Sequence, residues 1–196
     1  NAEATIKESI NSILNQSYKN LEFLIIDDGS TDNTYQKIKE YKNINVFQNK
    51  INLGLTKSLN FLISQTKGEY IARQDADDVS QLNRIKKQIT LMERLDLDFC
   101  STRALTYPEN KNRPGFTYYL PKRLVMKFKN PFIHGTLLIK KNIFEEVGFY
   151  NEKFYYSQDY KLMNDLLSKR YKYRVLKEPL YNLNIENNIS QNKKTE

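Results

Sequence analysis

The sequence predicts a doubly wound α/β domain with a mostly parallel sheet and helices on both faces. Apolar residues at helical spacing alternate with short apolar runs over the first hundred residues, and this alternation is typical of parallel strands joined by helices. Residues 21–26 (Leu-Glu-Phe-Leu-Ile-Ile) are nearly continuously apolar, as in a strand covered on both faces. Two of the runs end in aspartates, at the edge where open α/β sheets bind ligands.

The first half of the chain shows this alternation most clearly. Ile6, Ile10, Ile13 and Leu14 recur at helical spacing and predict the first helix. Residues 27–32 form a polar turn with residues that commonly start helices. Helices are expected over residues 3–15, 32–42, from 55 to near 68, and 82–95, and strands over residues 21–26, 44–47, 70–72 and 98–104.

The second half is less regular. Residues 106–117 contain two prolines and a glycine and are expected to form a loop. Ser157 is a suitable N-cap for a late helix. Helices are expected over residues 121–129, 141–147 and 157–169, and strands over residues 132–139, 171–176 and 180–183, the last two on either side of Pro179.

Length and composition predict one domain over residues 1–196, long enough for a sizeable core. The single cysteine, Cys100, excludes an internal disulfide bond and is compatible with a reducing compartment. No stretch is apolar enough to span a membrane, and no signal peptide is visible. We therefore expect a cytoplasmic protein.

The formal net charge of +8 predicts anionic partners: phosphates, a membrane surface or nucleic acid. Nucleic acid is not expected, because no motif interleaves aromatic and basic residues as a stacking platform requires. A basic group would lie either on the inner face of an anionic membrane, as a peripheral contact, or on a solvated helix face. This group consists of Lys122, Arg123, Lys127 and Lys129.

The most informative stretch is residues 68–78, a short strand followed by three aspartates. Asp75, Asp77 and Asp78 lie within four positions. Carboxylates at such short separations repel one another and raise one another's pKa. A hard divalent cation, Mg²⁺ or Mn²⁺, would relieve that repulsion. A solvated acidic turn before the next helix is the alternative interpretation.

Two further acidic positions accompany this turn. Asp27 and Asp28 follow the strand at residues 21–26, and Asp159 lies in the first turn of an expected helix, where the helix dipole favours an anion. Each position alone is weak evidence. Acidic residues at two strand ends together indicate a ligand-binding edge.

Four motifs occur in one order along the chain. Residues 24–32 read Leu-Ile-Ile-Asp-Asp-Gly-Ser-Thr-Asp, and Asn-Leu-Gly follows at 52–54. Gly-Glu-Tyr-Ile at 68–71 precedes Asp-Ala-Asp-Asp at 75–78, and Gly-Phe-Tyr-Asn-Glu-Lys-Phe at 148–154 precedes Gln-Asp-Tyr-Lys-Leu at 158–162. The set resembles family 2 glycosyltransferases of the GT-A fold, of the bacterial surface-polysaccharide type.

The resemblance implies transfer of a sugar, with inversion, from a nucleotide-diphosphate donor to a glycan or lipid-linked acceptor. A UDP-sugar is the expected donor, and Mn²⁺ or Mg²⁺ is the implied cofactor, held by Asp77 of the DXD motif. Asp159 would be the general base. Asp28 would bond the nucleotide base, with Asp27 supporting the turn, and Asp75 would contact the ribose. Further residues expected at the nucleotide-sugar site are Asn1, Asn52 and Ala76.

The chain departs from the family pattern in three places. Only Asn1 remains of the family's first strand, so we expect the chain to lack that strand. Gln158 stands where the family usually has Glu. Trp is absent, so the Gln-x-x-Arg-Trp motif of processive synthases is missing and a single-addition enzyme is favoured. By resemblance, residues 1–105 form a nucleotide-sugar-binding half and residues 106–196 an acceptor-side half.

Several residues have two interpretations. His134, the only histidine, is expected at the start of a strand, with either a structural or a phosphate-proximal role. Lys57 is either an exposed helix lysine or a phosphate contact. Four aromatic residues would belong to the core or stack on a sugar ring: Tyr150, Phe154, Tyr155 and Tyr156.

Two other functions stay open at this point. A nucleotidyltransferase also uses an α/β sheet with metal-holding carboxylates, but it would need a Gly-rich, basic phosphate loop near the N-terminus, and none is seen. A catalytically inactive nucleotide-sugar-binding module is the other alternative, motivated by Gln158 and by the missing first strand.

Overall fold

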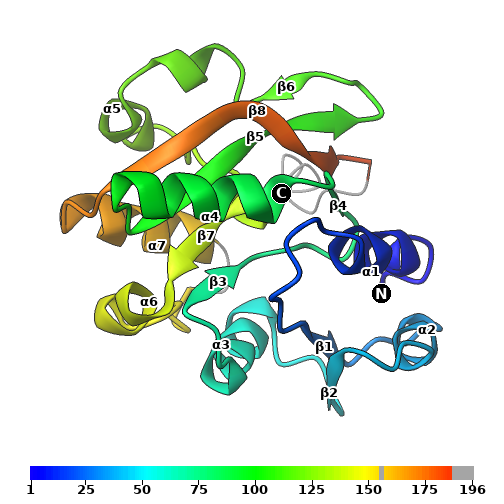
Figure 1. The fold of residues 1–196 in the computed structure, drawn as a ribbon. Helices are drawn as coiled ribbons and strands as arrows, with labels where there is room; N and C mark the ends of the chain where they lie inside the picture. Colours follow the sequence, from blue (N-terminus) through cyan, green and yellow to red (C-terminus); the bar gives the residue numbers. More distant parts are fainter. Residues whose placement is uncertain (155–156, 187–196) are drawn as a thin grey trace, which may run out of the picture.

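Two sheets organise the residues that the structure, a computed structural model, describes, namely 1–154 and 157–186 (Figure 1). The small sheet is a parallel pair. The larger sheet has the strand order β3-β7-β5-β8-β4, with β6 paired to β5. The strands are β1 (Leu24–Asp28), β2 (Asn45–Asn49), β3 (Tyr70–Ala72), β4 (Val79–Ser80), β5 (Phe99–Tyr107), β6 (Asn112–Arg113), β7 (Leu138–Lys140) and β8 (Tyr173–Asn184).

Helices cover both faces of the larger sheet (Figure 1). None of them, within the described ranges, has the length and apolar content to cross a bilayer. The α-helices are α1 (Ile6–Leu14), α2 (Thr34–Lys39), α3 (Leu55–Gln65), α4 (Arg84–Leu95), α5 (Lys122–Met126), α6 (Lys141–Val147) and α7 (Gln158–Ser168), and the 3₁₀ helices are η1 (Phe116–Tyr119) and η2 (His134–Thr136).

The two faces of the larger sheet are built from alternating residues of its central strands. Cys100 of β5 and Leu138 of β7 pack against α4, whereas their neighbours Phe99 and Ile139 face α3, α6 and α7. Successive side chains of a strand point to opposite faces, so two consecutive apolar residues pack against the helices on opposite faces of the sheet. This is the physical basis of the continuous apolar runs in the sequence.

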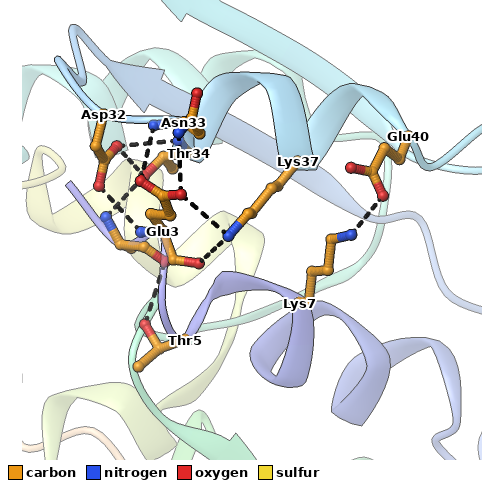
Figure 2. A network of polar contacts seen from close by, with 9 residues as sticks. Glu3, Thr5, Lys7, Asp32, Asn33, Thr34, Lys37 and Glu40 are labelled. Carbon is orange, nitrogen blue, oxygen red and sulfur yellow. Dashed lines mark hydrogen bonds and ion pairs between the residues drawn. The ribbon is translucent and has the colours of Figure 1, made fainter.

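The chain start is held against α2 by polar contacts (Figure 2). The Asp32 carboxylate accepts hydrogen bonds from the backbone N–H of Glu3 and of Thr34. Glu3 in turn accepts hydrogen bonds from Asn33 and pairs with Lys37 at 3.3 Å. Hydrogen bonds from Thr34 hold the pKa of Asp32 at about 2. Beneath these contacts, α1, α2 and the small sheet share an apolar cluster centred on Ile6, Ile10 and Ile38.

The predicted α/β class is confirmed, but the strand directions are more mixed than expected. β5 pairs with β8 in parallel, as β1 does with β2, whereas β7 runs antiparallel to both of its neighbours, β3 and β5. β3 and β5 therefore run in the same direction, as expected, but they are not adjacent. The alternation of helices and strands predicts which segments are strands, and it does not specify that β7 enters between two earlier ones.

Two local expectations were wrong. Residues 134–136 are a 3₁₀ turn before β7, so His134 does not begin a strand. Pro179 does not separate two strands either, because β8 runs through it with a register shift: Thr102 pairs with Leu176 and Arg103 pairs with Pro179. Proline lacks an N–H, and a β-bulge accommodates it. Within the expected loop, the structure forms β6 and η1.

The single-domain organisation and its two halves stay predictions. Strands from both predicted halves interleave in one sheet, with β7 and β8 of the second half placed on either side of β5.

Gly29, directly after β1, is required by both its conformation and its surroundings. Its φ is +73°, and a Cβ there would lie 2.6 Å from the backbone N of Asn52. The turn after β1 and the loop at residues 51–54 can approach this closely only with glycine at position 29. Gly148 also has a positive φ, +90°, but a Cβ there would meet nothing within 4 Å.

These two glycines form a matched pair for mutation. We expect Gly148→Ala to lower the free energy of unfolding by about 1–2 kcal/mol, the strain of a left-handed non-glycine residue. Gly29→Ala is expected to cost clearly more, because backbone atoms must also move. Urea unfolding of both variants measures the difference, and equal losses would contradict the close approach at Gly29.

Candidate active site

The acidic turn after β3 rests on a buried arginine of α4. Arg84 is fully buried and donates hydrogen bonds of 2.8 Å to the carbonyl oxygens of Arg73 and Gly135. Its guanidinium also lies 5.2 Å from the centre of the Tyr181 ring on β8. One side chain thereby joins the end of β3, the η2 turn and β8. Burial lowers the pKa of Arg84 to about 10, so it is charged at neutral pH.

Asp75 is held at the centre of this region by an ion pair. Its Oδ1 lies 2.6 Å from a guanidinium nitrogen of the buried Arg73. Its backbone N–H donates a 3.1 Å hydrogen bond to the Tyr181 hydroxyl. Burial alone would raise the pKa of Asp75, but the Arg73 charge, the Arg73 hydrogen bond and the charges of His134 and Arg84 together lower it. A Cβ at Gly135 would lie 2.3 Å from the hydroxyl of the buried Tyr181 and 2.9 Å from Asp75 Oδ2, so glycine allows this close packing.

The next two aspartates differ in environment. Asp77 is exposed, and partial burial and the Asp75 charge raise its pKa. Asp78 is buried and accepts a 2.7 Å hydrogen bond from the backbone N–H of Asn184. Burial, with the Asp75 charge second, raises the pKa of Asp78 to about 7. Asp77 is therefore the most exposed of the three aspartates, since Asp75 is half-buried. Ala76 is exposed too, and its carbonyl accepts a bond from Thr5.

The described residues contain no group of three or more His, Cys, Asp and Glu side chains that would hold a metal by protein ligands alone. The acidic turn fits a different kind of site. Mg²⁺ is commonly bound by one or two carboxylates together with substrate phosphates. Asp77, exposed beside the ionised Asp75, offers that donor set.

The half-buried His134 and the buried Tyr150 form a pair beside this turn. His134 Nε2 lies 2.6 Å from the Tyr150 hydroxyl. Burial, and then the Arg73 charge, lower the pKa of His134 to about 4, so it is neutral at pH 7. The charges of Asp75 and Asp159 act on both members of the pair. The pair therefore lies between the acidic turn and the first turn of α7.

Asp159 occupies the first turn of α7, as expected. The Asn130 side-chain amide donates a 2.8 Å hydrogen bond to Asp159 Oδ2. Because that bond uses one oxygen of a half-buried carboxylate, the other oxygen stays available as an acceptor. Gln158, which replaces the family's usual Glu, directly precedes it and leaves this arrangement intact.

A second group of predicted residues lies around the end of β1. Both oxygens of Asp28 are bonded within the protein: Oδ1 accepts from Asn49 at 2.7 Å and from Leu53 N–H at 3.0 Å, and Oδ2 accepts from Gly54 N–H at 2.9 Å. Burial would raise the pKa of Asp28, but these bonds lower it. Asp28 therefore has a structural role, holding the 52–54 loop, and its contact with a nucleotide base stays a prediction.

The neighbours of Asp28 complete this group. Asp27 is buried, and its Oδ1 has no hydrogen-bond partner among the described residues. Asn1 spans the turn after β1, where its Oδ1 accepts a 2.8 Å bond from Thr31 N–H. The Asn52 side chain accepts a bond from Gly54 N–H. Lys57 lies exposed on α3, as the simpler interpretation expected.

Helix α1 connects the two groups. Its Ser9 hydroxyl donates a 2.8 Å hydrogen bond to the backbone carbonyl of Asp75, and Thr5 bonds the carbonyl of Ala76 at 3.1 Å. Before the start of α1, Asn1 contacts the turn after β1. The predicted residues therefore form two neighbouring groups, one at the end of β1 and one between β3, η2 and α7.

The sequence interpretation missed the residues that hold these carboxylates. Arg73, Arg84, Tyr181 and Asn130 were not predicted, and Tyr150 had two open roles. Arg84 had a detectable signal, because Arg84 and Gln88 lie one helical turn apart beside the apolar residues of α4, and both are fully buried. Tyr150 is buried, whereas Phe154 is exposed; Tyr155 and Tyr156 lie outside the described residues.

A groove of about 570 Å³ lies elsewhere, between the end of α4, η1 and the start of β8. Its lining includes Tyr118, Tyr173 and Arg174 but none of the predicted site residues. This groove is therefore separate from the candidate active site, which is recognised by its charged side chains.

Sequence comparison finds relatives among glycosyltransferases. EpsE, a protein of Bacillus subtilis (strain 168) named as a glycosyltransferase, is 38% identical over 157 residues, covering 76% of this chain and 56% of EpsE. WbnJ of Escherichia coli, named as an O-antigen biosynthesis glycosyltransferase, is 30% identical, covering 93% of this chain and 75% of WbnJ. WfgD of Escherichia coli, named as a UDP-Glc:alpha-D-GlcNAc-diphosphoundecaprenol beta-1,3-glucosyltransferase, is 30% identical, covering 68% of this chain and 62% of WfgD. The chain spans little more than half the length of EpsE.

Solved structures and the family description agree with these relatives. TarS 1-349 of S. aureus in complex with UDP-GlcNAc superposes with a TM-score of 0.83 at 19% identity, covering 98% of this chain and 58% of that TarS chain. Its complex with UDP gives a TM-score of 0.80. The family described as "Glycosyl transferase family 2" matches residues 1–150. This chain therefore belongs to glycosyltransferase family 2 and has the GT-A fold of that family.

Proposed function

We propose that this chain transfers a sugar, with inversion, from a UDP-sugar to a glycan or lipid-linked acceptor in surface-polysaccharide synthesis. The observation that carries the proposal is that Asp75 of the acidic turn and Asp159 of α7 both act on the charge of the His134–Tyr150 pair, with the exposed Asp77 two residues from Asp75. The uridine donor is supported by the name of WfgD and by the UDP and UDP-GlcNAc complexes of TarS.

The donor side of the reaction belongs to the acidic turn. Asp75 is fixed by Arg73 and would receive the ribose hydroxyls, since an ionised carboxylate accepts hydrogen bonds. Asp77 would hold Mn²⁺ or Mg²⁺ together with the donor diphosphate. Such an ion would neutralise charge on the diphosphate as it leaves. The raised pKa of Asp77 supports this role, because a cation relieves its repulsion from Asp75.

The acceptor side belongs to the start of α7. The acceptor hydroxyl oxygen attacks the anomeric carbon as the bond from that carbon to the phosphate oxygen breaks, and Asp159 takes the hydroxyl proton. Asn130 orients the Asp159 carboxylate through the bond to Oδ2. A single displacement with the base opposite the leaving group inverts the configuration, by analogy with inverting glycosidases.

His134 serves this arrangement as a neutral group. Its Nε2 contacts the Tyr150 hydroxyl, and burial beside Arg73 makes protonation unfavourable. A neutral imidazole can bond a phosphate oxygen or a sugar hydroxyl without adding charge. The phosphate-proximal role of His134 is part of this proposal.

The site of action follows from the acceptor class. We propose a cytoplasmic enzyme in peripheral contact with the membrane, where a lipid-linked acceptor would be held. WfgD, by its name, acts on a diphosphoundecaprenol-linked sugar, which supports this class of acceptor.

Removal of the base tests the acceptor step. Asp159→Asn is expected to lower the rate of sugar transfer about 10²–10⁴-fold, the usual contribution of a general base, while UDP-sugar affinity is kept. Asp165→Asn, on the same helix and paired with Lys161, is the matched control and should leave the rate unchanged. Unaltered turnover by the Asp159 variant would exclude the assignment.

Removal of the metal ligand tests the donor step. UDP-sugar at about 100 times its dissociation constant should stabilise the protein by roughly 2.7 kcal/mol, and the Mn²⁺-dependent part of that thermal shift should vanish in Asp77→Asn. Asp96→Asn, which is exposed and distant in sequence from the turn, is the control. A Mn²⁺ effect that persists in the Asp77 variant would remove Asp77 from the metal site.

The pH dependence of stability tests the state of His134. Its folded pKa is about 4, below the ordinary value of 6.5, so the unfolded chain binds more protons between those values. The stability it contributes is complete above about pH 6.5 and is lost as the pH falls towards 4. Since His134 is the only histidine, His134→Gln should flatten the unfolding free energy between pH 6.5 and 4. Parallel curves for both proteins would contradict a neutral, half-buried imidazole.

A further inference from the structure

The outward face of η1 and α5 carries large apolar side chains that no described residue covers. Phe116 is 77% exposed and Phe128 is 83% exposed, and Tyr119 and Leu124 are exposed at 65% and 50%. All four lie within 13 positions of the chain. We name these four residues the η1–α5 face. It lies at the upper edge of the larger sheet in Figure 1.

This exposure is not a lack of packing in α5. Val125 and Met126 are buried and form the inward side of the helix. Leu124 is exposed on the helix itself, and Phe128 is exposed in the turn that directly follows it. The helix and its following turn thus expose apolar residues in addition to the buried ones, although exposed apolar residues add no packing inside the protein. An apolar patch of this kind marks an interaction surface.

Exposed cations surround the apolar residues. Between Tyr107 and Asn130, the only acidic residue is Glu109, and it pairs with Lys111 at 3.2 Å. The exposed basic residues of this segment are Lys111, Arg113, Arg123, Lys127 and Lys129.

One member of the predicted basic group is not available on this surface. Lys122 is buried, and its ammonium donates hydrogen bonds to the carbonyl oxygens of Thr117, at 3.1 Å, of Tyr118, and of Leu120, at 3.2 Å. It closes the turn between η1 and α5 from the inside. Lys122 therefore fixes the turn that presents the aromatic residues, and the other basic residues supply the surface charge.

The η1–α5 face is linked directly to the proposed acceptor side. Phe128 and Lys129 precede Asn130, whose side chain bonds Asp159. The Tyr160 hydroxyl, next to Asp159, donates a 2.5 Å hydrogen bond to the carbonyl of Met126 at the end of α5. Two hydrogen bonds thus tie the end of α5 and its following turn to the first turn of α7.

We propose that the η1–α5 face docks on an anionic membrane leaflet, with Phe116, Tyr119 and Phe128 at the level of the lipid headgroups. Aromatic and leucine side chains bordered by lysine and arginine are the composition that binds such an interface. The exposed cations select a negatively charged leaflet. Docking there would hold a lipid-linked acceptor beside Asp159, and this last step rests on the proposed function.

The test uses the full-length protein and sedimentation with vesicles of phosphatidylcholine alone or with 30% phosphatidylglycerol. We expect binding to the anionic vesicles only. Phe116→Ser with Phe128→Ser should weaken that binding about tenfold or more, since each Phe loses its apolar burial. Lys127→Gln with Lys129→Gln should weaken it about fivefold per cation.

Matched controls separate this face from general charge and apolarity. Lys39→Gln with Lys42→Gln makes the same charge change around α2, which lies at the opposite end of the molecule from α5 (Figure 1). Leu82→Ser removes an apolar side chain that is 57% exposed between β4 and α4. Both controls should bind anionic vesicles as the unaltered protein does.

The proposal is overturned if the protein ignores anionic vesicles, if it binds both vesicle types equally, or if controls and face variants lose binding alike. Binding that the face variants leave unchanged would also overturn it. That result is expected if another segment or a protein partner covers the face. The UDP thermal shift should be unchanged in every face variant. A failed docking test therefore leaves the donor site intact, whereas a missing UDP shift in the unaltered protein counts against the proposed function.

Discussion

The fold of the site depends on one buried cation, the guanidinium of Arg84. It bonds the carbonyl oxygens of Arg73 and Gly135 and lies against the Tyr181 ring. These three contacts belong to β3, η2 and β8, which are far apart in sequence. A charged group this deep costs free energy unless its donors are satisfied and its charge is balanced. The two carbonyl bonds and the nearby aspartates offset part of that cost, while the Arg84 Nε has no partner among the described residues.

The same balance of charge explains why three neighbouring aspartates differ. Asp75 is paired with Arg73 and is ionised, while Asp78 is buried beside it with a raised pKa. The remaining carboxylate, Asp77, faces solvent. The turn thus places the exposed carboxylate of Asp77 close to the carboxylate of Asp75, which Arg73 holds in place. One or two carboxylates of this kind, together with substrate phosphates, are a common ligand set for Mg²⁺.

The acceptor side is built on different supports from the donor side. Asp159 takes its orientation from Asn130 and its place from the first turn of α7. Asn130 follows α5, whose outward side is apolar and whose surroundings are basic. The acidic turn instead is held by hydrogen bonds from Arg84 of α4 and Ser9 of α1. In the proposed reaction, each substrate would therefore meet a separate set of elements, with the His134–Tyr150 pair near both.

The sequence by itself determined most of the helices and strands and their order, the family and the positions of the acidic residues. These are local properties: apolar periodicity, turn residues and short motifs are readable within a few positions. Only the tertiary structure decided that β7 runs between β3 and β5, that Asp28 is occupied by the 52–54 loop, and that Lys122 is buried. It also decided that Arg73 and Arg84 support the acidic turn. The physical reason is that strand partners, desolvation and the pairing of buried charges depend on which distant segments meet, and no local pattern in the chain specifies that.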